Sequence, residues 1–268
     1  AITRRLIQEH GFSIVAVEAD WPDAARIDRY VRDRGPGAYD EDSFARFPTW
    51  MWRNQEVADF LHWLRGHNMS LPEQQRTEFR GLDVYSLRSS VDAVLDYLDM
   101  TDPDEARKAR RRYGCLTPWQ MDPAHYGRSV LYGQRDPCED KVVEQLRELL
   151  NHKLDYAAAG DEAFFDAAQN ARIVRAAEQY YRIMYHGGND SWNLRDRHMF
   201  ETLEALLEHR GITPWIPVFG AYKPVIEDFT YQVDRDEYRC RADKPLPFHK
   251  YRPTADGVWM KLYRAAYA

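Results

Sequence analysis

The chain has 268 residues, of which 44% are hydrophobic and 13% aromatic, so it can bury a sizeable core in one large domain or two ordinary ones. No apolar run approaches the ~18 residues that a membrane span needs. The net charge of −6 argues against nucleic acid as the partner of the whole chain, and we expect a globular protein with no membrane partner.

The cysteines and the chain ends give two further expectations. Cys115, Cys138 and Cys240 are odd in number, far apart and without a CxxC spacing, which indicates neither a zinc site nor a disulfide framework. We therefore predict a reducing, cytoplasmic location. The chain begins inside a helical pattern rather than at Met, and it ends on Tyr-Ala, so both ends are predicted to be cut.

The first third of the chain follows the helix–strand–helix pattern of an α/β sheet. A helix is predicted over residues 2–10, ending at Gly11, and a short β-branched apolar run over 13–17 predicts a buried strand. An acidic turn over 18–21 follows, and Pro22 begins a helix that extends to about Asp33.

The same pattern then repeats. Residues 54–66 predict an amphipathic helix, and residues 78–84 predict a second strand that ends in an acid. Ser86 is expected to cap a helix that follows this strand.

The sequence from 102 to 209 is almost wholly helical and predicts a helical subdomain beside the sheet. The expected helices cover residues 102–113, 138–152, 161–185 and 194–209. The remaining tail instead predicts short strands, at 215–218, 229–231 and 237–240.

The composition changes after Gly211. Residues 1–211 hold 28 basic and 36 acidic side chains, whereas residues 212–268 hold 9 basic and 7 acidic ones. Such a shift is typical of a domain boundary or of a junction between unrelated sequences. We predict a partial α/β core over 1–101, a helical subdomain over 102–211 and a β-rich segment over 212–268, with an incomplete sheet in the core.

The strongest candidates for chemistry are acids at the ends of the two predicted strands. Glu18 and Asp20 follow the first strand and Asp83 ends the second, and in open α/β sheets ligands bind at the carboxyl ends of strands. If the strands are neighbours, Glu18 and Asp83 share a rim and could divide acid and base roles. The alternative is structural: Asp20 and Asp83 cap helices, and Glu18 pairs with an arginine.

A second group lies at the start of the last long helix. Arg195 could hold a carboxylate, such as that of Glu18, through a bidentate pair, and Asp196 would suit the helix dipole. Ser191 or Asn193 would cap this helix, and the alternative for Arg195 is a buried salt bridge.

Other common site patterns are missing from the sequence. The nine histidines form no HxH, HxxxH or HExxH spacing, so each is expected at the surface or as a cap, with no metal and no triad. No GxSxG elbow and no phosphate-binding loop occurs, and no cofactor is predicted. Four aromatic residues are expected to form core: Phe44, Phe47, Trp50 and Trp52.

Four blocks together resemble the erythromycin esterase family in order and spacing. They are AVEADWPD at residues 16–23, RFPTWMWRN at 46–54, GLDVYSL at 81–87 and SWNLRDRHM at 191–199. The stretch QNAR at 169–172 is also similar to the family. The resemblance covers residues 1–211.

This resemblance implies an α/β core with an inserted helical bundle and the hydrolysis of an ester, which in resistance enzymes is the macrolide lactone. It further implies that a histidine held among acids activates water, without a covalent acyl-enzyme. Glu18 carries over as an active-site acid. We place Asp20, Asp83, Tyr85, Arg195 and Asp196 around it as supporting or substrate-binding residues.

Two family blocks have no counterpart in this sequence. One is a glycine-glutamate-histidine-glycine block that precedes the first helix and supplies the general base, and the other is a histidine-asparagine-x-histidine block that follows the position of Gly211. Loss of a general base costs a factor of roughly 10²–10⁴ in rate. We therefore predict an erythromycin-esterase-like hydrolase that is truncated and catalytically incomplete, acting on a small-molecule ester or macrolide.

The tail resembles a different family. Residues 212–218, 227–231, 236–240 and 253–258 are similar to a piece of a DDE-type insertion-sequence transposase, without a complete set of catalytic acids. Two alternatives stay open beside the hydrolase: a non-catalytic binding or regulatory module on the same scaffold, and nucleic-acid binding by the tail.

Overall fold

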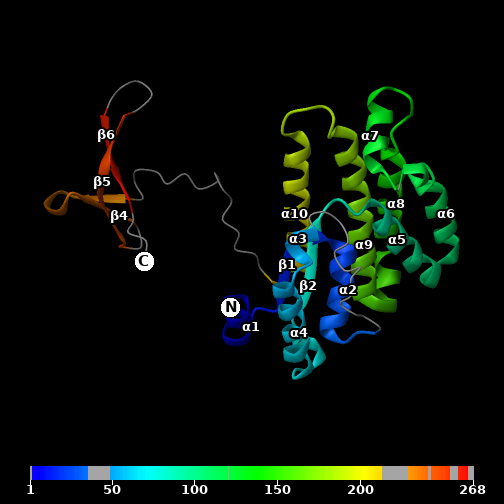
Figure 1. Cartoon of the computed structure of the whole chain (residues 1–268), viewed down its shortest axis with the longest axis horizontal. Helices are drawn as coiled ribbons and strands as arrows, with labels where there is room; N and C mark the ends of the chain where they lie inside the picture. Colours follow the sequence, from blue (N-terminus) through cyan, green and yellow to red (C-terminus); the bar gives the residue numbers. More distant parts are fainter. Residues whose placement is uncertain are drawn as a thin grey trace. The chain divides into compact units, whose positions relative to one another are not determined.

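The computed structural model describes residues 2–35, 49–119, 121–212, 229–240, 243–253 and 259–264. The chain divides into two compact units, Ala1–Pro214 and Trp215–Ala268 (Figure 1). The helices described in the first unit are α1 (Ile2–His10), α2 (Trp21–Arg32), α3 (Thr49–Trp52), α4 (Gln55–Met69), α5 (Leu87–Thr101), α6 (Pro103–Tyr113), α7 (Pro123–Leu131), α8 (Glu139–Asn151), α9 (Lys153–Ile183) and α10 (Asp190–His209), with short 3-10 turns at Glu73–Gln75 and Thr117–Trp119.

Two parallel strands form the sheet described in the first unit. They are β1 (Ile14–Asp20) and β2 (Glu78–Asp83), and their carboxyl ends meet because Asp20 pairs with Asp83. Strand β2 is almost wholly buried, since both α2 and α10 contact it, whereas the first four residues of β1 are half-buried. The predicted α/β core and both predicted strands are confirmed.

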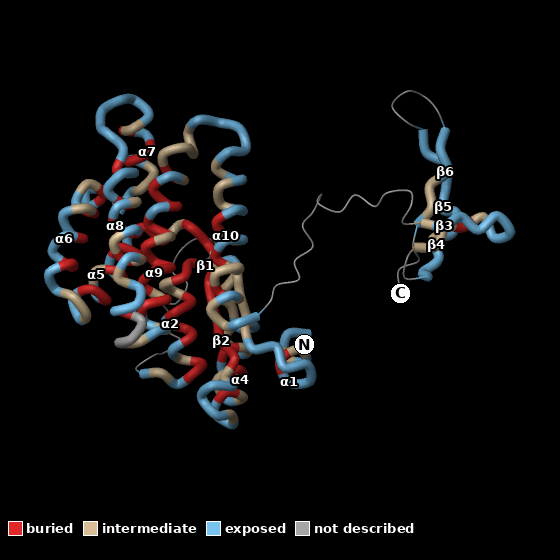
Figure 2. Tube along the Cα trace, turned by 180° about the vertical axis from the view of Figure 1, so that it is seen from behind, coloured by how far each residue is buried: buried red, intermediate tan, exposed pale blue. Residues whose placement is uncertain are grey.

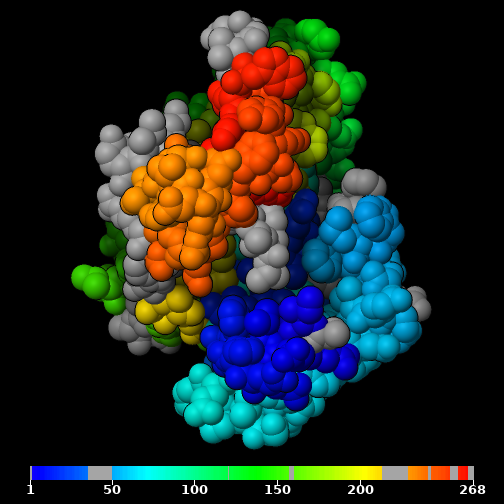
Figure 3. All heavy atoms as spheres, turned by 90° about the vertical axis from the view of Figure 1, so that its left-hand side faces the viewer, coloured from blue at the N-terminus to red at the C-terminus, as the bar shows by residue number. Residues whose placement is uncertain are grey.

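Helix α1 covers an outer part of this core. Its residue Ile7 is buried with the apolar side chains of β1, α2 and α4. Arg4 donates a hydrogen bond to the backbone carbonyl of Asp59 in α4 (3.1 Å) and lies over the ring of Trp63. Figure 3 shows α1 on the surface beside the segment that contains α3 and α4.

The helical subdomain is built around α9, which contacts α5, α7, α8 and α10. Figure 2 shows buried residues concentrated along this helix and the sheet. Helix α7, which the sequence did not predict, approaches α9 very closely at Gly127. A Cβ atom added there would lie 1.7 Å from the carbonyl oxygen of Tyr181, so only glycine fits.

Buried ion pairs join the helical subdomain to the sheet. Arg80 on β2 is 1% exposed, and its guanidinium reaches Glu162 (2.9 Å) and Asp166 (3.1 Å) on α9. It also bonds Glu78 on its own strand (2.9 Å). A buried arginine needs partners for its charge. These ion pairs therefore fix the position of β2 relative to α9.

The second unit is a curled antiparallel sheet in its described residues. Its strands are β3 (Phe229–Gln232), β4 (Glu237–Cys240), β5 (Pro245–Pro253) and β6 (Trp259–Tyr263), in that order. The predicted strands at 229–231 and 237–240 are confirmed, whereas the one at 215–218 lies outside the described residues. At the turn between β3 and β4, the Asp236 carboxylate accepts hydrogen bonds from Tyr231 (2.6 Å), Tyr263 (2.7 Å) and Lys261 (2.9 Å).

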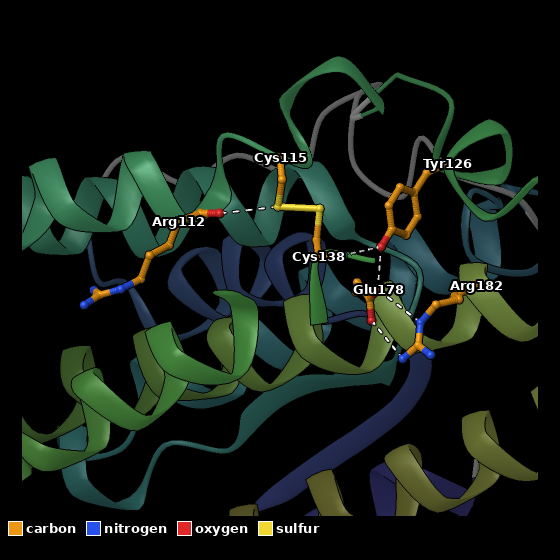
Figure 4. Close-up of a disulfide and its surroundings, with 6 residues drawn as sticks. All are labelled: Arg112, Cys115, Tyr126, Cys138, Glu178 and Arg182. Atoms are coloured by element: carbon orange, nitrogen blue, oxygen red, sulfur yellow. Dashed lines mark hydrogen bonds and ion pairs between the residues drawn. A yellow bond between two sulfur atoms is a disulfide. The ribbon is translucent and has the colours of Figure 1, made fainter. Parts of the chain in front are cut away.

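The cysteine prediction is wrong. Cys115, which follows α6, and Cys138, which precedes α8, form a disulfide with their Cα atoms 6.0 Å apart (Figure 4). The fold brings the two together although 23 positions separate them, and Cys240 is free. The cytoplasmic location stays a prediction, without support from the cysteines, because disulfides are rare in that compartment. No described helix has the length and apolar character of a membrane span.

Candidate functional site

The site begins at an irregular end of β1. Of the predicted acidic turn over 18–21, residues 18–20 belong to the strand and Trp21 begins α2. The pairing slips between Val17 and Asp20, so β1 bulges at Glu18 and Ala19. Opposite the bulge lies Gly81, where a Cβ atom would come within 2.4 Å of the carbonyl oxygen of Ala19. A side chain at position 81 would therefore push the bulge away, and bulges are a common means of re-aiming a side chain beside a site.

Trp52 fixes the backbone of the bulge from another element. Its indole nitrogen donates a hydrogen bond to the carbonyl oxygen of Glu18 (2.9 Å). Trp52 is half-buried in the core beside β1, whereas Trp50 is 68% exposed. The prediction of aromatic core therefore holds for Trp52 and fails for Trp50, and Phe44 and Phe47 lie outside the described residues.

Arg195 on α10 joins the ends of the two strands. Its Nε donates to Asp83 Oδ1 (2.9 Å) and its Nη2 donates to Asp83 Oδ2 (2.8 Å), which is a bidentate pair. The same Nη2 donates to Glu18 Oε1. The structure thus brings together Glu18, Asp83 and Arg195, and the arginine–acid pair expected from the sequence forms with both acids.

The two acids on this arginine differ in their exposure to solvent. The Asp83 side chain is 5% exposed and also accepts a hydrogen bond from the backbone N–H of Val84 (2.8 Å). The Glu18 side chain is 45% exposed, and its second oxygen has no hydrogen-bond partner among the described residues. The hydrogen bonds that Arg195 donates to Asp83 and then to Glu18 raise its pKa, so the guanidinium stays charged at any working pH.

The ring of Tyr85 packs against the guanidinium of Arg195. The guanidinium carbon lies 5.3 Å from the centre of the Tyr85 ring, which is the geometry of a cation–π contact. The Tyr85 hydroxyl lies 3.4 Å from that of Tyr180, and Tyr181 donates to the Tyr85 carbonyl (3.2 Å). Burial raises the pKa of Tyr85, so its hydroxyl remains protonated and neutral beside the ion pair.

Asp20 and Asp196 are the remaining two predicted site residues. Asp20 is 7% exposed at the first position before α2, and its side chain makes no cap hydrogen bond to that helix. Asp196 is exposed on α10, and it forms no hydrogen bond or ion pair with the side chains of Glu18 or Asp83, both of which bind Arg195 in the described part of the chain. Helix α10 already begins at Asp190, so Ser191 lies inside the helix and does not cap it.

His198 is a buried residue that the sequence reasoning placed wrongly at the surface or as a cap. It is 6% exposed on α10, and its Nε2 lies 3.5 Å from the hydroxyl oxygen of Thr202 on the same helix. Burial lowers its pKa to about 4, so the ring is neutral at pH 7. Its spacing from Arg195 could have indicated this burial. His198 follows Arg195 by three positions, and residues three apart share one face of a helix.

His198 also lines a cavity of about 580 Å³ between α8, α9 and α10. Charged side chains on its wall include Arg175, Arg197 and Glu201. A volume of this size can hold a drug-sized ligand. Within the described ranges, no three histidine, cysteine or acidic side chains gather as a metal site.

Three solved structures share the fold of this chain at low sequence identity. A succinoglycan biosynthesis protein has a TM-score of 0.61 at 18% identity, over 77% of this chain and 48% of that chain. A Bacillus cereus protein has a TM-score of 0.61 at 20% identity, over 78% and 49%. A mutant of the erythromycin esterase EreC in its open conformation has a TM-score of 0.57 at 14% identity, over 78% and 53%. The chain therefore spans about half the length of these solved structures.

The family assignment rests on a family model that matches most of the sequence. The model of the family described as erythromycin esterase matches residues 7–220, which includes β1, β2 and every described helix after α1. This match contains Glu18, Asp83 and Arg195, whereas most of the second unit lies beyond it. With four fifths of its length matched, the chain belongs to the erythromycin esterase family.

Proposed function

We propose that this chain carries the acidic part of a site for water-mediated ester hydrolysis, with Glu18 as its reacting carboxylate. The observation that supports this most directly is the unequal exposure of the two acids on Arg195, 45% for Glu18 and 5% for Asp83. Asp83 occupies the arginine with both oxygens and is closed to solvent. Glu18 keeps one oxygen open, and an open carboxylate oxygen can order a water molecule or take its proton.

The substrate class follows from the family. We propose a small-molecule ester or a macrolide lactone, split by water into an acid and an alcohol. We propose that the general base is missing: among the described residues, no histidine forms a hydrogen bond or ion pair with Glu18, and the ring of His198 is buried and neutral. A site without that base should be slower by roughly 10²–10⁴. We therefore expect weak turnover by this chain.

The test measures hydrolysis by the full chain with a macrolide lactone as substrate and mass spectrometry as the readout. Wild type, Glu18→Gln and Glu9→Gln are compared with buffer alone. Glu9→Gln is the matched control, since Glu9 on α1 is also a glutamate paired with an arginine at similar exposure, 52% against 45% for Glu18. We expect slow hydrolysis by wild type and Glu9→Gln, and none by Glu18→Gln. Equal rates for Glu18→Gln and wild type would refute the role of Glu18.

The alternative function is binding without turnover. It is favoured by the cavity of about 580 Å³ together with the lack of a histidine at Glu18 in the described residues. A ligand present at 100 times its Kd stabilises the folded state by about 2.7 kcal/mol. Hydrolysis equal to buffer together with such a stabilisation by the macrolide would support this alternative. No stabilisation would count against it.

A further inference from the structure

A second cavity adjoins the larger one and lies between the same three helices. It has a volume of about 320 Å³ and is lined by residues of α8, α9 and α10. The two cavities share Arg175, His198 and Glu201. Because Arg175 and Glu201 are exposed, the second cavity opens to solvent. Its volume is sufficient for a small molecule.

The α9 wall of this cavity carries two arginines without an acidic partner. Arg172 and Arg175 line the cavity and are three positions apart, so they share one face of the helix. Among the described residues, neither guanidinium forms an ion pair or a hydrogen bond. Burial, and then the positive charge of Arg175, lower the pKa of Arg172, although an arginine in a protein stays protonated. The wall therefore presents two positive charges that no carboxylate contacts.

The α10 wall carries acids that are also unpaired. Glu201, Glu204 and Glu208 line the cavity, and their spacing of three and four positions places them on one face of α10. In the part of the chain that the structure describes, none of the three forms an ion pair, although two arginines line the same cavity. The fold thus holds opposite charges apart, with a space between them where salt bridges could otherwise form.

The remaining lining and the mixture of charges define the ligand. Leu146 and Leu150 of α8 and Ala205 of α10 add apolar surface. A simple anion would meet three acids as well as two arginines, and a simple cation would meet the arginines as well as the acids. A ligand with one charge of each sign, at the two ends of a short apolar chain, would neutralise both walls. A carboxylate suits the planar fork of arginine, and an ammonium group donates hydrogen bonds to carboxylates.

We propose that this cavity binds a small zwitterion, whose carboxylate lies at Arg172 and Arg175 and whose ammonium group lies at the glutamates of α10. The apolar body of the ligand packs against the leucines of α8. This binding site is separate from Glu18 and requires no turnover, so it stands or falls independently of the proposed hydrolysis.

The probe is 6-aminohexanoate, titrated into the full chain at low salt and followed by ¹H–¹⁵N NMR of the arginine Nε–H groups. We expect saturable shifts of the Arg172 and Arg175 signals, and Arg172→Gln and Arg175→Gln each remove one signal and so assign it. Hexanoate and hexylamine each lack one of the two charges. They should bind at least ~10-fold more weakly, because each loses the hydrogen bonds between a charged group and one wall.

Variants of each wall complete the test. Arg175→Gln and Glu208→Gln should each weaken the binding of 6-aminohexanoate at least ~10-fold. Arg147→Gln is the matched control, because Arg147 on α8 is as exposed in character as Arg175 but does not line the cavity, so binding should be unchanged.

Three outcomes would overturn the proposal. They are the lack of a saturable shift, hexanoate or hexylamine binding as tightly as 6-aminohexanoate, and equal weakening by Arg147→Gln and Arg175→Gln. The comparison of the three probes needs only the wild-type protein, so the test remains valid if a variant does not fold.

Discussion

The Cys115–Cys138 disulfide gives the most direct test of how the helical subdomain is held together. The bond closes a loop of 23 residues that contains α7. In the chain-entropy model, a loop of this length restricts the unfolded chain enough to stabilise the fold by about 3 kcal/mol at 25 °C. Reduction should lower the free energy of unfolding of the first unit by about that amount.

The native contacts around the bond should survive reduction, because other interactions hold them. The Tyr126 hydroxyl accepts a hydrogen bond from the Cys138 backbone N–H (2.8 Å) and donates to the buried Glu178 carboxylate (2.5 Å). Glu178 is also paired with Arg182 (3.2 Å), as Figure 4 shows. The effect of reduction is therefore expected in the unfolded chain, with little change in the folded structure.

The assay is urea unfolding followed by fluorescence, with and without a phosphine reductant. The double variant Cys115→Ala/Cys138→Ala should match the reduced wild type and no longer respond to the reductant. Cys240→Ser is the control, since Cys240 is free and should leave the response to reductant unchanged. Alkylation of all three cysteines in unreduced protein, or equal stability with the bond intact and reduced, would refute the reasoning.

Three further predictions concern the site and the sheet. Gly81→Ala should destabilise the protein by about 1–3 kcal/mol, because the new Cβ meets the backbone of the bulge. Gly66→Ala, in open space on α4, should instead stabilise it by up to ~1 kcal/mol. Urea unfolding midpoints measure both effects, and equal midpoints for the two variants would contradict the prediction. Arg80→Met should cost about 3 kcal/mol, because Asp166 loses the guanidinium that it pairs with, although Asp28 keeps Arg32 and Glu78 keeps Arg210. Arg5→Met, at a solvent-exposed pair, should change stability by less than ~1 kcal/mol in the same assay. The pKa of His198 is about 4 in the folded state against 6.5 in the unfolded chain, so its neutral ring stabilises the fold by about 3 kcal/mol above pH 6.5, and this stabilisation is lost as the pH falls toward 4. His198→Gln should remove this part of the pH dependence of the free energy of unfolding, and an unchanged pH profile would contradict the prediction.

Local pattern was sufficient for most of the secondary structure. The β-branched run before Glu18 and the strand that ends at Asp83 were identifiable because short apolar runs between helical periods indicate buried strands. The rule that acids at the carboxyl ends of parallel strands converge then placed Glu18 near Asp83, and the structure has both on Arg195. These features depend on neighbouring residues in the sequence, which is why they could be predicted.

The remaining features depend on distant parts of the chain. Nothing near Cys115 indicates that Cys138 lies beside it, because the packing of α6 and α8 decides that distance. The bulge at Glu18 requires a glycine on the neighbouring strand, at Gly81, and neither position reveals the pairing register. The burial of His198 depends on how α10 packs against β2 and α9, which its neighbours in the sequence do not indicate.

The geometry of the ion-pair cluster of Arg195, Asp83 and Glu18 also explains why the two acids differ although the same arginine binds both. A guanidinium that forms a bidentate pair has little freedom left, since two parallel N–H···O bonds fix the plane and the direction of its planar fork. Arg195 is therefore fixed by Asp83, and Glu18 meets it as a rigid partner. A more flexible lysine in its place could follow Glu18 into solvent and neutralise it fully. Arg195→Lys should therefore keep the charge balance of the cluster but lose the fixed orientation of Glu18, and with it whatever turnover depends on that orientation.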